Sequence, residues 1–326
     1  MGAFDIGSIR VAEQRIRDHV VRTPLLTSPM LNERANCNVY VKAESLQLTG
    51  SFKVRGALNK ILAMDDESRQ SGFVAFSAGN HGQGVAAAAR LVKVPAVIVM
   101  PNTAPKVKVE NCRWWGAEIV IYDPHVEDRA EVARRIAEPR GMTVIPPFDD
   151  YDIIAGQGTC GLEIVDQLRE LKVTPDALVI NCSGGGLAAG VTEAVKQTFP
   201  SVHVFIAEVS GFEKMARSIA TGVAQSNHTV PKTVLDGIAG PTAGGKTLDV
   251  LRRHDVRGIG VTDDEGMRGV AAAFKMLKLV LEPGGAASLG AVLSEKLSIV
   301  HRNVVVIASG GNVDTSVFAQ AITHSS

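Results

Sequence analysis

The stretch ALVINCSGGGLAAG, residues 177–190, joins an apolar run to a run of small residues through three consecutive glycines. The apolar residues 177–181 predict a buried strand, and the residues after the glycines predict a helix. A glycine-rich turn between a strand and a helix exposes backbone N–H groups that can bind a phosphate. Neither a P-loop lysine nor the dinucleotide pattern G-x-G-x-x-G is present, so a single terminal phosphate fits better than a nucleotide. The alternative interpretation is a flexible loop.

The same order of apolar run and helix-like segment continues in both directions along the chain. Strands that alternate with helices predict the α/β class, with mainly parallel sheets covered by helices on both faces. The charged N-terminal stretch, residues 1–21, predicts an amphipathic helix and not a signal peptide. Further strands are predicted at residues 39–41, 73–76, 95–100, 118–122, 203–207 and 303–308, and helices at 83–91, 106–115 and 127–138.

The unit from Phe73 to about Val144 is a candidate domain of its own. A polar stretch precedes it, and two prolines and a polar turn follow it. Domain boundaries fall in such exposed polar segments. We therefore expect a small α/β domain, residues 69–146, inserted into a large domain formed by residues 1–68 and 147–326.

The composition excludes several classes of protein. The 326 residues carry 34 Lys and Arg against 34 Asp and Glu, so no excess of positive charge favours nucleic acid or an anionic membrane. The longest apolar stretches are too short to span a bilayer. The four cysteines form no C-x-x-C pair, which favours reduced, buried thiols and a cytoplasmic protein.

A candidate reactive lysine lies in the segment TGSFKVRGA, residues 49–57. Lys53 stands where a loop becomes a helix, and the glycines at positions 50 and 56 allow close approach to the backbone. A lysine in an enclosed site can lose its proton and attack a carbonyl to form an imine. The alternative is a solvated surface lysine beside a core phenylalanine.

Two more glycine-rich turns follow apolar strands. SAGNHGQG, residues 77–84, opens a helix whose N-terminus would bind an anion such as a carboxylate. ASGGN, residues 308–312, places Ser309 at a strand end, where ligand sites lie in parallel sheets. The alternatives are a simple helix cap and a tight turn. An imine-forming lysine, a phosphate loop, a carboxylate site and a serine for a ring nitrogen together are the groups that a pyridoxal-phosphate (PLP) enzyme needs.

The order and the amino-acid sequences of these segments resemble those of the fold-type II PLP enzymes, specifically the serine/threonine dehydratase and serine racemase group. The resemblance runs from RTPL, residues 22–25, to NVD, residues 312–314, and SFKVRGA and AGQGT (residues 155–159) carry it most specifically. It implies the tryptophan synthase β-like architecture, in which two three-layer α/β domains with mainly parallel sheets close over the substrate. It also implies a homodimer.

The resemblance assigns roles to residues as well. Lys53 would carry the cofactor and move the α-proton, and Arg129 matches a position that binds a second substrate carboxylate in some relatives. The alternative for Arg129 is a surface helix arginine. The implied cofactor contacts come from Phe52, Lys53, Asn80, Gly184, Gly185, Gly186, Leu187, Gly237, Glu282 and Ser309, and the implied substrate contacts from Ser77, Ala78, Gly79, Asn80, His81 and Arg129.

Two positions depart from the pattern of the resemblance. Ala78 stands where the racemases carry a serine that moves a proton on the opposite face of the substrate, so we expect elimination and not racemisation. Some members bind a divalent cation through the positions that are Glu208, Phe212 and Lys214 here. A lysine ammonium cannot bind a cation, so we expect no metal.

The function that follows is a PLP-dependent ammonia-lyase that removes water from a β-hydroxy amino acid of the L-threonine or L-serine type. Three alternatives stay open: a dehydratase for another β-hydroxy amino acid such as 3-hydroxyaspartate, a racemase with side elimination activity, and a binding protein without PLP. A β-replacement enzyme is disfavoured because those enzymes carry a threonine at the position of His81.

Overall fold

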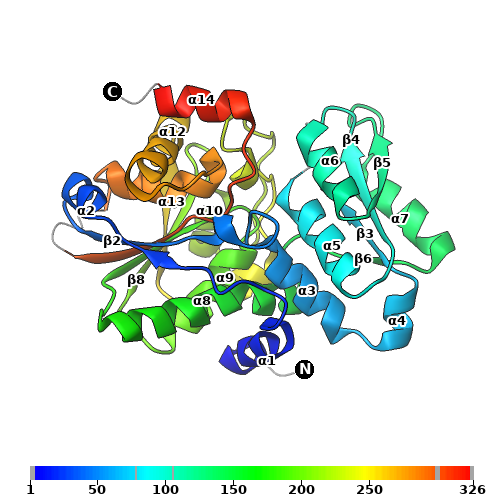
Figure 1. Cartoon of the computed structure of the whole chain (residues 1–326), viewed down its shortest axis with the longest axis horizontal. Coiled ribbons are helices and arrows are strands. Elements are labelled where there is room, and N and C mark those ends of the chain that lie inside the picture. The colour runs from blue at the N-terminus through cyan, green and yellow to red at the C-terminus, as the bar shows by residue number, and fades with distance from the viewer. Residues whose placement is uncertain (1–3, 78, 105, 298–301, 324–326) are drawn as a thin grey trace.

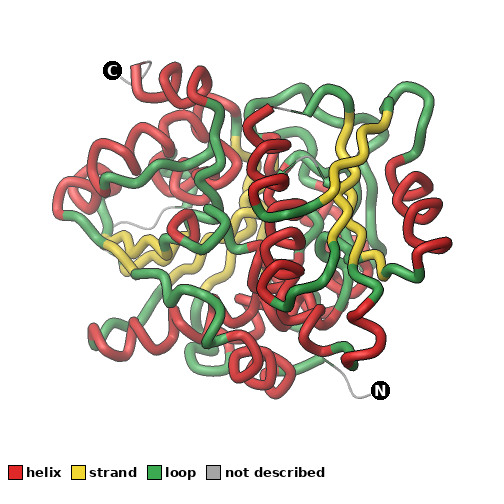
Figure 2. The backbone as a smooth tube through the Cα atoms, turned by 45° about the vertical axis from the view of Figure 1, so that its right-hand side comes forward, coloured by secondary structure: helices red, strands yellow, loops and turns green. Residues whose placement is uncertain are grey.

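The computed structural model describes residues 4–77, 79–104, 106–297 and 302–323. Figure 1 shows two lobes, each built around its own sheet, with the smaller lobe on the right in cyan to green. Helices flank the strands in both lobes (Figure 2). The α/β class with two mainly parallel sheets, predicted from the alternation of strands and helices, is confirmed.

The six-stranded sheet forms the centre of the larger lobe, in the order β1-β2-β10-β7-β8-β9. Only β1 runs antiparallel to its neighbour. Because the central strands are buried on both faces, they read as near-continuous apolar runs. The strands are β1 (Leu25–Leu26), β2 (Asn38–Lys42), β7 (Ala177–Asn181), β8 (His203–Val209), β9 (Val256–Val261) and β10 (Asn303–Ile307).

Helices cover both faces of this sheet and enclose two apolar clusters. One face carries α2 (Pro29–Ala35), α12 (Asp263–Ala272), α13 (Pro283–Leu293) and α14 (Thr315–Thr323), together with the π-helical turn η3 (Ala273–Leu277). The other face carries α1 (Ile6–Ile16), α8 (Tyr151–Leu171), α9 (Gly186–Lys196), α10 (Lys214–Thr221) and α11 (Gly245–Leu251). Two short 3-10 turns, η1 (Glu44–Leu46) and η2 (Asp236–Ile238), lie in the loops.

The four-stranded sheet of the smaller lobe is wholly parallel, in the order β5-β4-β3-β6. Its strands are β3 (Phe73–Phe76), β4 (Ala96–Pro101), β5 (Glu118–Tyr122) and β6 (Thr143–Val144). The helices are α4 (Asp66–Gln70), α5 (Asn80–Leu91), α6 (Lys106–Trp114) and α7 (Arg129–Arg140). The predicted small domain, residues 69–146, encloses this sheet, and its exact limits stay a prediction.

Helix α3 (Lys53–Ala63) joins the two lobes, because it packs against both α5 and α8. Glycines make this packing close: a Cβ atom added to Gly156 of α8 would lie 2.5 Å from the carbonyl oxygen of Arg55. Gln157 of α8 accepts a hydrogen bond from the backbone N–H of Gly56 at 3.2 Å. The AGQGT segment is therefore the contact surface for α3.

The end of α6 carries the only two tryptophans of the chain. The rings of Trp114 and Trp115 meet edge to face with their centroids 4.8 Å apart. The guanidinium of Arg90, from α5, lies 5.0 Å from the Trp114 ring. Trp114 itself is 66% exposed, so this aromatic pair lies on the outer surface of the smaller lobe.

Several predicted elements need correction. The predicted helix at 127–138 begins at Arg129, because the Asp128 side chain accepts hydrogen bonds from the N–H groups of Ala130 and Glu131 and so caps it. The N-terminal helix is described over Ile6–Ile16 only. Strand β9 was not predicted, because two glycines and an arginine hide its apolar positions. In the part of the chain that the structure describes, no helix is long and apolar enough to cross a membrane.

Candidate active site

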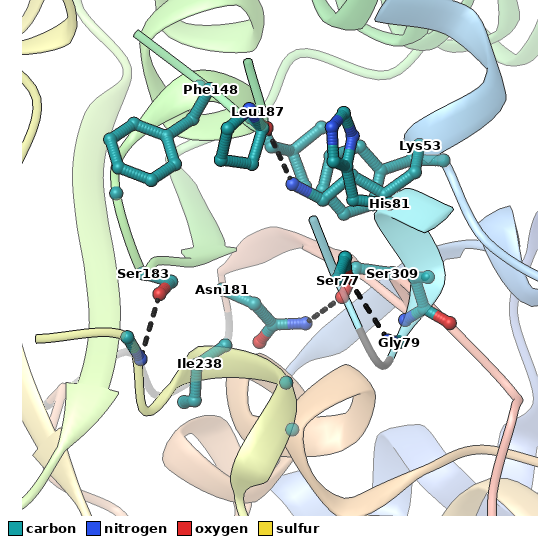
Figure 3. A pocket seen from close by; sticks show the side chains of 18 of the residues that line it. Lys53, Ser77, Gly79, His81, Phe148, Asn181, Ser183, Leu187, Ile238 and Ser309 are labelled. Carbon is teal, nitrogen blue, oxygen red and sulfur yellow. Dashed lines mark hydrogen bonds between the residues drawn. The ribbon is translucent and has the colours of Figure 1, made fainter. Parts of the chain in front are cut away.

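A cavity of about 340 Å³ lies between the two lobes. Its wall is formed largely by the segments that follow β3, β7 and β10, so it lies beyond the carboxyl ends of parallel strands. All the predicted site residues that the structure describes line this cavity, and many of them are drawn in Figure 3. Ala78 falls outside the described residues.

Lys53 is the first residue of α3, and its amine enters the cavity from one side (Figure 3). The Nζ atom donates a hydrogen bond to the carbonyl oxygen of Pro147 at 2.8 Å and lies 5.3 Å from the centre of the Phe52 ring. Burial lowers the pKa of Lys53 to about 8. Near neutral pH about a tenth of this amine is therefore unprotonated, far more than for an ordinary lysine, and this fraction can act as a nucleophile or a general base.

The glycine loop between β7 and α9 forms the opposite wall. Gly185 has a φ of 98°, which a residue with a side chain rarely adopts. A Cβ atom at Gly184 would overlap the ring of Phe148, and one at Gly185 would lie 2.6 Å from the Met215 methyl group. The first N–H groups of α9 have no partner within the helix, so the loop and the helix end together form a cradle for an anion.

Ser309 lies at the carboxyl end of β10 and lines the cavity. Its hydroxyl oxygen accepts a hydrogen bond from the Asn181 side-chain amide at 2.9 Å, which leaves the hydroxyl hydrogen free to donate. Asn181 is fixed in turn, because its carbonyl oxygen accepts from the N–H of Ser288 at 2.5 Å. We did not predict Asn181, although its place at the end of a buried strand was a usable signal.

Asn80 is the first residue of α5 and bridges the lobes. Its amide donates to Glu282 at 2.5 Å, and its carbonyl oxygen accepts from Asn312 at 2.7 Å. Burial, and next the negative charge of Asp236, raise the pKa of Glu282 to about 7, against the opposite effect of Lys108. Lys108, which we also did not predict, lines the cavity and pairs with Asp236 at 3.3 Å.

The N-terminus of α5 supplies a second place for an anion. Gly79 donates its N–H to the Ser77 hydroxyl at 3.1 Å, which shapes the turn before the helix. The ring of His81 is buried, and its Nε2 atom lies 2.9 Å from the carbonyl oxygen of Ile145. The ring is already used in that hydrogen bond. If His81 contacts a substrate carboxylate, it therefore does so through its backbone N–H.

Arg129 lies at the mouth of the cavity, at the first position of α7. Its guanidinium lies 5.6 Å from the centre of the Phe76 ring. The carboxylate of the preceding residue, Asp128, caps α7 instead. Among the described residues, no carboxylate lies within ion-pair distance of Arg129, so the cavity mouth holds a cation without a counter-charge.

Glu208 and Lys214, two of the positions through which some relatives were expected to bind a cation, do not line this cavity. Lys214 places its ammonium 3.5 Å from the Glu208 carboxylate, and both side chains are buried. Glu208 also accepts hydrogen bonds from the N–H groups of Met215 and Ala216. No three His, Cys, Asp or Glu side chains in the described ranges lie close enough together to hold a metal ion.

The donor set of the cavity fits PLP. An amine with a lowered pKa, a cradle of N–H groups for a phosphate and a serine hydroxyl for a ring nitrogen line one cavity. Its volume lies at the lower end of the range of about 300–1,000 Å³ that is common for cofactor and ligand sites. These are the groups with which a protein binds and orients this cofactor.

The comparisons with known proteins agree with this fit. The family model described as "Pyridoxal-phosphate dependent enzyme" matches residues 16–310. The L-threo-3-hydroxyaspartate ammonia-lyase of Saccharomyces cerevisiae is 37% identical over 97% of this chain and 96% of its own length. The L-threonine ammonia-lyase of Thermotoga maritima is also 37% identical, over 96% of this chain and 77% of its own. The structure of maize serine racemase is 36% identical, with a TM-score of 0.90 and coverage of 99% of this chain and 98% of that one.

Proposed function

Because this chain belongs to the pyridoxal-phosphate dependent enzymes and is a carbon–oxygen lyase of the threonine dehydratase type, we propose that its preferred substrate is a β-hydroxy amino acid with a second carboxylate, such as 3-hydroxyaspartate. The sequence alone favoured threonine or serine. The observation that changes this preference is Arg129, a cation at the cavity mouth that has no acidic partner among the described residues. Similarity does not decide between the two substrates, since relatives of both kinds are 37% identical to this chain.

The residues of this chain would divide the work as follows. The N–H groups of Gly184 to Leu187 would hold the phosphate, and the Ser309 hydroxyl, oriented by Asn181, would donate to the ring nitrogen. PLP supplies the electron sink that stabilises the substrate carbon once its α-proton has left. A neutral hydroxyl at the ring nitrogen does not favour full protonation of the ring, which suits prompt loss of the β-hydroxyl.

The substrate would be held at two ends. Its α-carboxylate lies against the N-terminus of α5, where the backbone N–H groups of residues 79–81 and the helix dipole favour an anion. Its second carboxylate pairs with Arg129. Lys53 takes the α-proton as the general base, and its ammonium can return that proton to the departing β-hydroxyl, which leaves as water. Hydrolysis of the released enamine then gives a 2-oxo acid and ammonia.

The test is a substrate panel with a charge variant. We expect 3-hydroxyaspartate to give the highest kcat/KM, and Arg129→Gln to lower it by about 10–100-fold, since a hydrogen bond to a charged group contributes about 1.5–3 kcal/mol. Turnover of L-serine should change by less than about threefold, because serine has no second carboxylate. The control is Arg134→Gln, an exposed arginine of the same helix that pairs with Glu131 outside the cavity.

A preference for L-threonine or L-serine that is unchanged in Arg129→Gln would contradict this assignment and restore the alternative. That alternative has its own support, because the aromatic ring of Phe76 lies beside Arg129 and Ile238 lines the same cavity. Apolar groups there suit the methyl group of threonine. Loss of the absorbance of a bound imine in Lys53→Ala tests the cofactor lysine itself, and light scattering tests the expected homodimer.

A further inference from the structure

The amine of Lys53 is held by a backbone oxygen and not by an acid. Its hydrogen-bond partner is the carbonyl of Pro147, at 2.8 Å. Five titratable or charged groups from both lobes line the same cavity, but in the part of the chain that the structure describes none of them forms an ion pair with this amine. These groups are His81, Lys108, Arg129, Asp236 and Glu282.

The segment that carries this carbonyl connects the lobes and is fixed at both ends. Ile145 donates its N–H to the carbonyl of Val74 at 2.8 Å, and its own carbonyl accepts from the His81 ring at 2.9 Å. At the other end, Asp149 accepts hydrogen bonds from the first N–H groups of α11, the shortest of them 2.8 Å. Pro146 and Pro147 have a restricted φ, so fewer backbone torsions are free between Ile145 and the carbonyl of Pro147.

His81 can hold this segment in one way only. A carbonyl oxygen accepts hydrogen bonds and cannot donate them, so the Nε2 atom of His81 carries the hydrogen. Burial, and next the charge of Lys53, lower the pKa of His81 to about 3, so the ring is neutral across the working range of pH. The ring is therefore a permanent donor and not a pH switch.

We propose that His81 is a positioning residue for the catalytic lysine: by fixing the carbonyl of Ile145, it places the carbonyl of Pro147 where this oxygen accepts one N–H of Lys53. The inference rests on the proposed role of Lys53 as the base. A single bond to a fixed acceptor orients the amine, so that its lone pair points in one direction toward the substrate. After Lys53 has taken the α-proton, the same oxygen stabilises the ammonium through its dipole.

A neutral acceptor suits this task better than an acid would. A carboxylate at the position of the Pro147 carbonyl would attract the ammonium strongly and keep Lys53 protonated, because an opposite charge close by favours the charged form. A carbonyl supplies direction at a lower electrostatic cost. The lysine can then change its charge during each turnover.

The experiment compares His81→Leu, which removes the donor, with His81→Gln, which keeps an N–H of similar reach. Lys53 of the cofactor-free protein is labelled with acetic anhydride over a series of pH values, and its peptide is quantified by mass spectrometry. We expect the wild-type lysine to titrate near 8. In His81→Leu we expect a fall of about one unit, because the ammonium loses a hydrogen bond, and near wild-type behaviour in His81→Gln.

Kinetics of the holoenzyme supply the second readout. We expect His81→Leu to lower kcat by about 10–100-fold with KM changed by less than about threefold, since only the orientation of the base is lost. His81→Gln should recover most of that loss. A lysine that titrates identically in wild type and His81→Leu, or an equal loss of kcat in both variants, would overturn the proposal.

A second variant tests the proposal in case the protein does not fold without His81. Pro147→Gly releases the φ angle of the linker and removes no core side chain, so the same fall in the Lys53 titration is expected. Pro200→Gly, in a turn before β8, is the matched control. The labelling uses neither cofactor nor substrate, so its result stands even if 3-hydroxyaspartate proves not to be the substrate. A wild-type Lys53 that titrates like an ordinary surface lysine also overturns the proposal.

Discussion

Two cations stand two residues apart at the start of α3, and their surroundings are opposite. Arg55 is fully buried and makes ion pairs with Glu44 at 2.8 Å and with Glu163 at 2.7 Å. Lys42 joins the same cluster through Glu163 at 2.6 Å. Lys53 meets one backbone carbonyl instead. One helix thus carries both a fully partnered charge and a sparsely partnered one.

The pKa values of Arg55 and Lys53 depend on whether a carboxylate lies beside each group. Burial alone would lower the pKa of Arg55, but the carboxylates of Glu44 and Glu163 raise it above its ordinary value. Burial lowers the pKa of Lys53 to about 8, because no carboxylate opposes it. Burial with a counter-charge makes a permanent ion that fixes the scaffold, whereas burial without one makes a group that can exchange a proton. The difference separates the structural charges of this chain from the one proposed to be catalytic.

The largest expected effect comes from Lys53→Met. Turnover should fall by at least about 10⁴-fold, because the variant loses the proposed base and the proposed cofactor attachment together. Stability should not fall. The folded-state pKa of about 8 lies below the ordinary lysine value of 10.5, so the unfolded chain binds more protons between these values. Wild-type stability should therefore rise with pH across that window, and Lys53→Met should lack this rise in urea unfolding of the cofactor-free protein.

The opposite result is expected for Arg55→Met, which leaves Glu44 buried without its guanidinium. We expect a loss of about 3–5 kcal/mol in the free energy of unfolding, as for other broken buried ion pairs. Lys60→Met is the control in the same helix, because Lys60 is partly exposed beside Asp150 and Asp152 and should cost about 1 kcal/mol or less. Equal losses in the two variants would contradict the comparison.

Much of this contrast between Lys53 and Arg55 could not be predicted from the sequence. Lys53 and the three glycine turns could be predicted, because a cofactor site on a parallel sheet uses local turns at strand ends. The partners of Arg55 could not, since Glu44 and Glu163 come from segments that are distant in sequence. The role of the Pro147 carbonyl as the hydrogen-bond acceptor of Lys53 could not be predicted either. Every residue has a backbone carbonyl, and no residue type indicates which carbonyl will accept a bond from a side chain.

Glu282 tests an intermediate case, a buried acid that has an amide partner in Asn80 and shares its cavity with Lys108, a cation that pairs with Asp236. Its folded-state pKa of about 7 exceeds the ordinary glutamate value of 4.5, so the folded chain binds the extra proton between these values. Wild-type stability should fall as the pH rises through that window. Glu282→Gln should lack the fall and exceed the wild type by about 3 kcal/mol above pH 7. Parallel stability curves for the two proteins would show that Glu282 ionises normally.

The smallest effect is expected from removal of metal ions. Lys214 pairs with Glu208 in the manner of the Arg55 cluster, so its ammonium stands where a cation would have to bind. Dialysis against a chelator should change turnover by less than about twofold and leave the melting temperature in place, because a bound metal would otherwise contribute to stability. Activation by added magnesium would place the cation elsewhere and contradict this expectation.

The tryptophan pair at the end of α6 has a practical consequence for optical work. Since Trp114 and Trp115 are the only indoles in the chain, its tryptophan fluorescence originates entirely in the smaller lobe. Their emission would not be averaged over signals from the larger lobe, and Trp114 is exposed enough to meet a soluble quencher. Stopped-flow fluorescence could therefore follow the smaller lobe during substrate binding without any introduced dye.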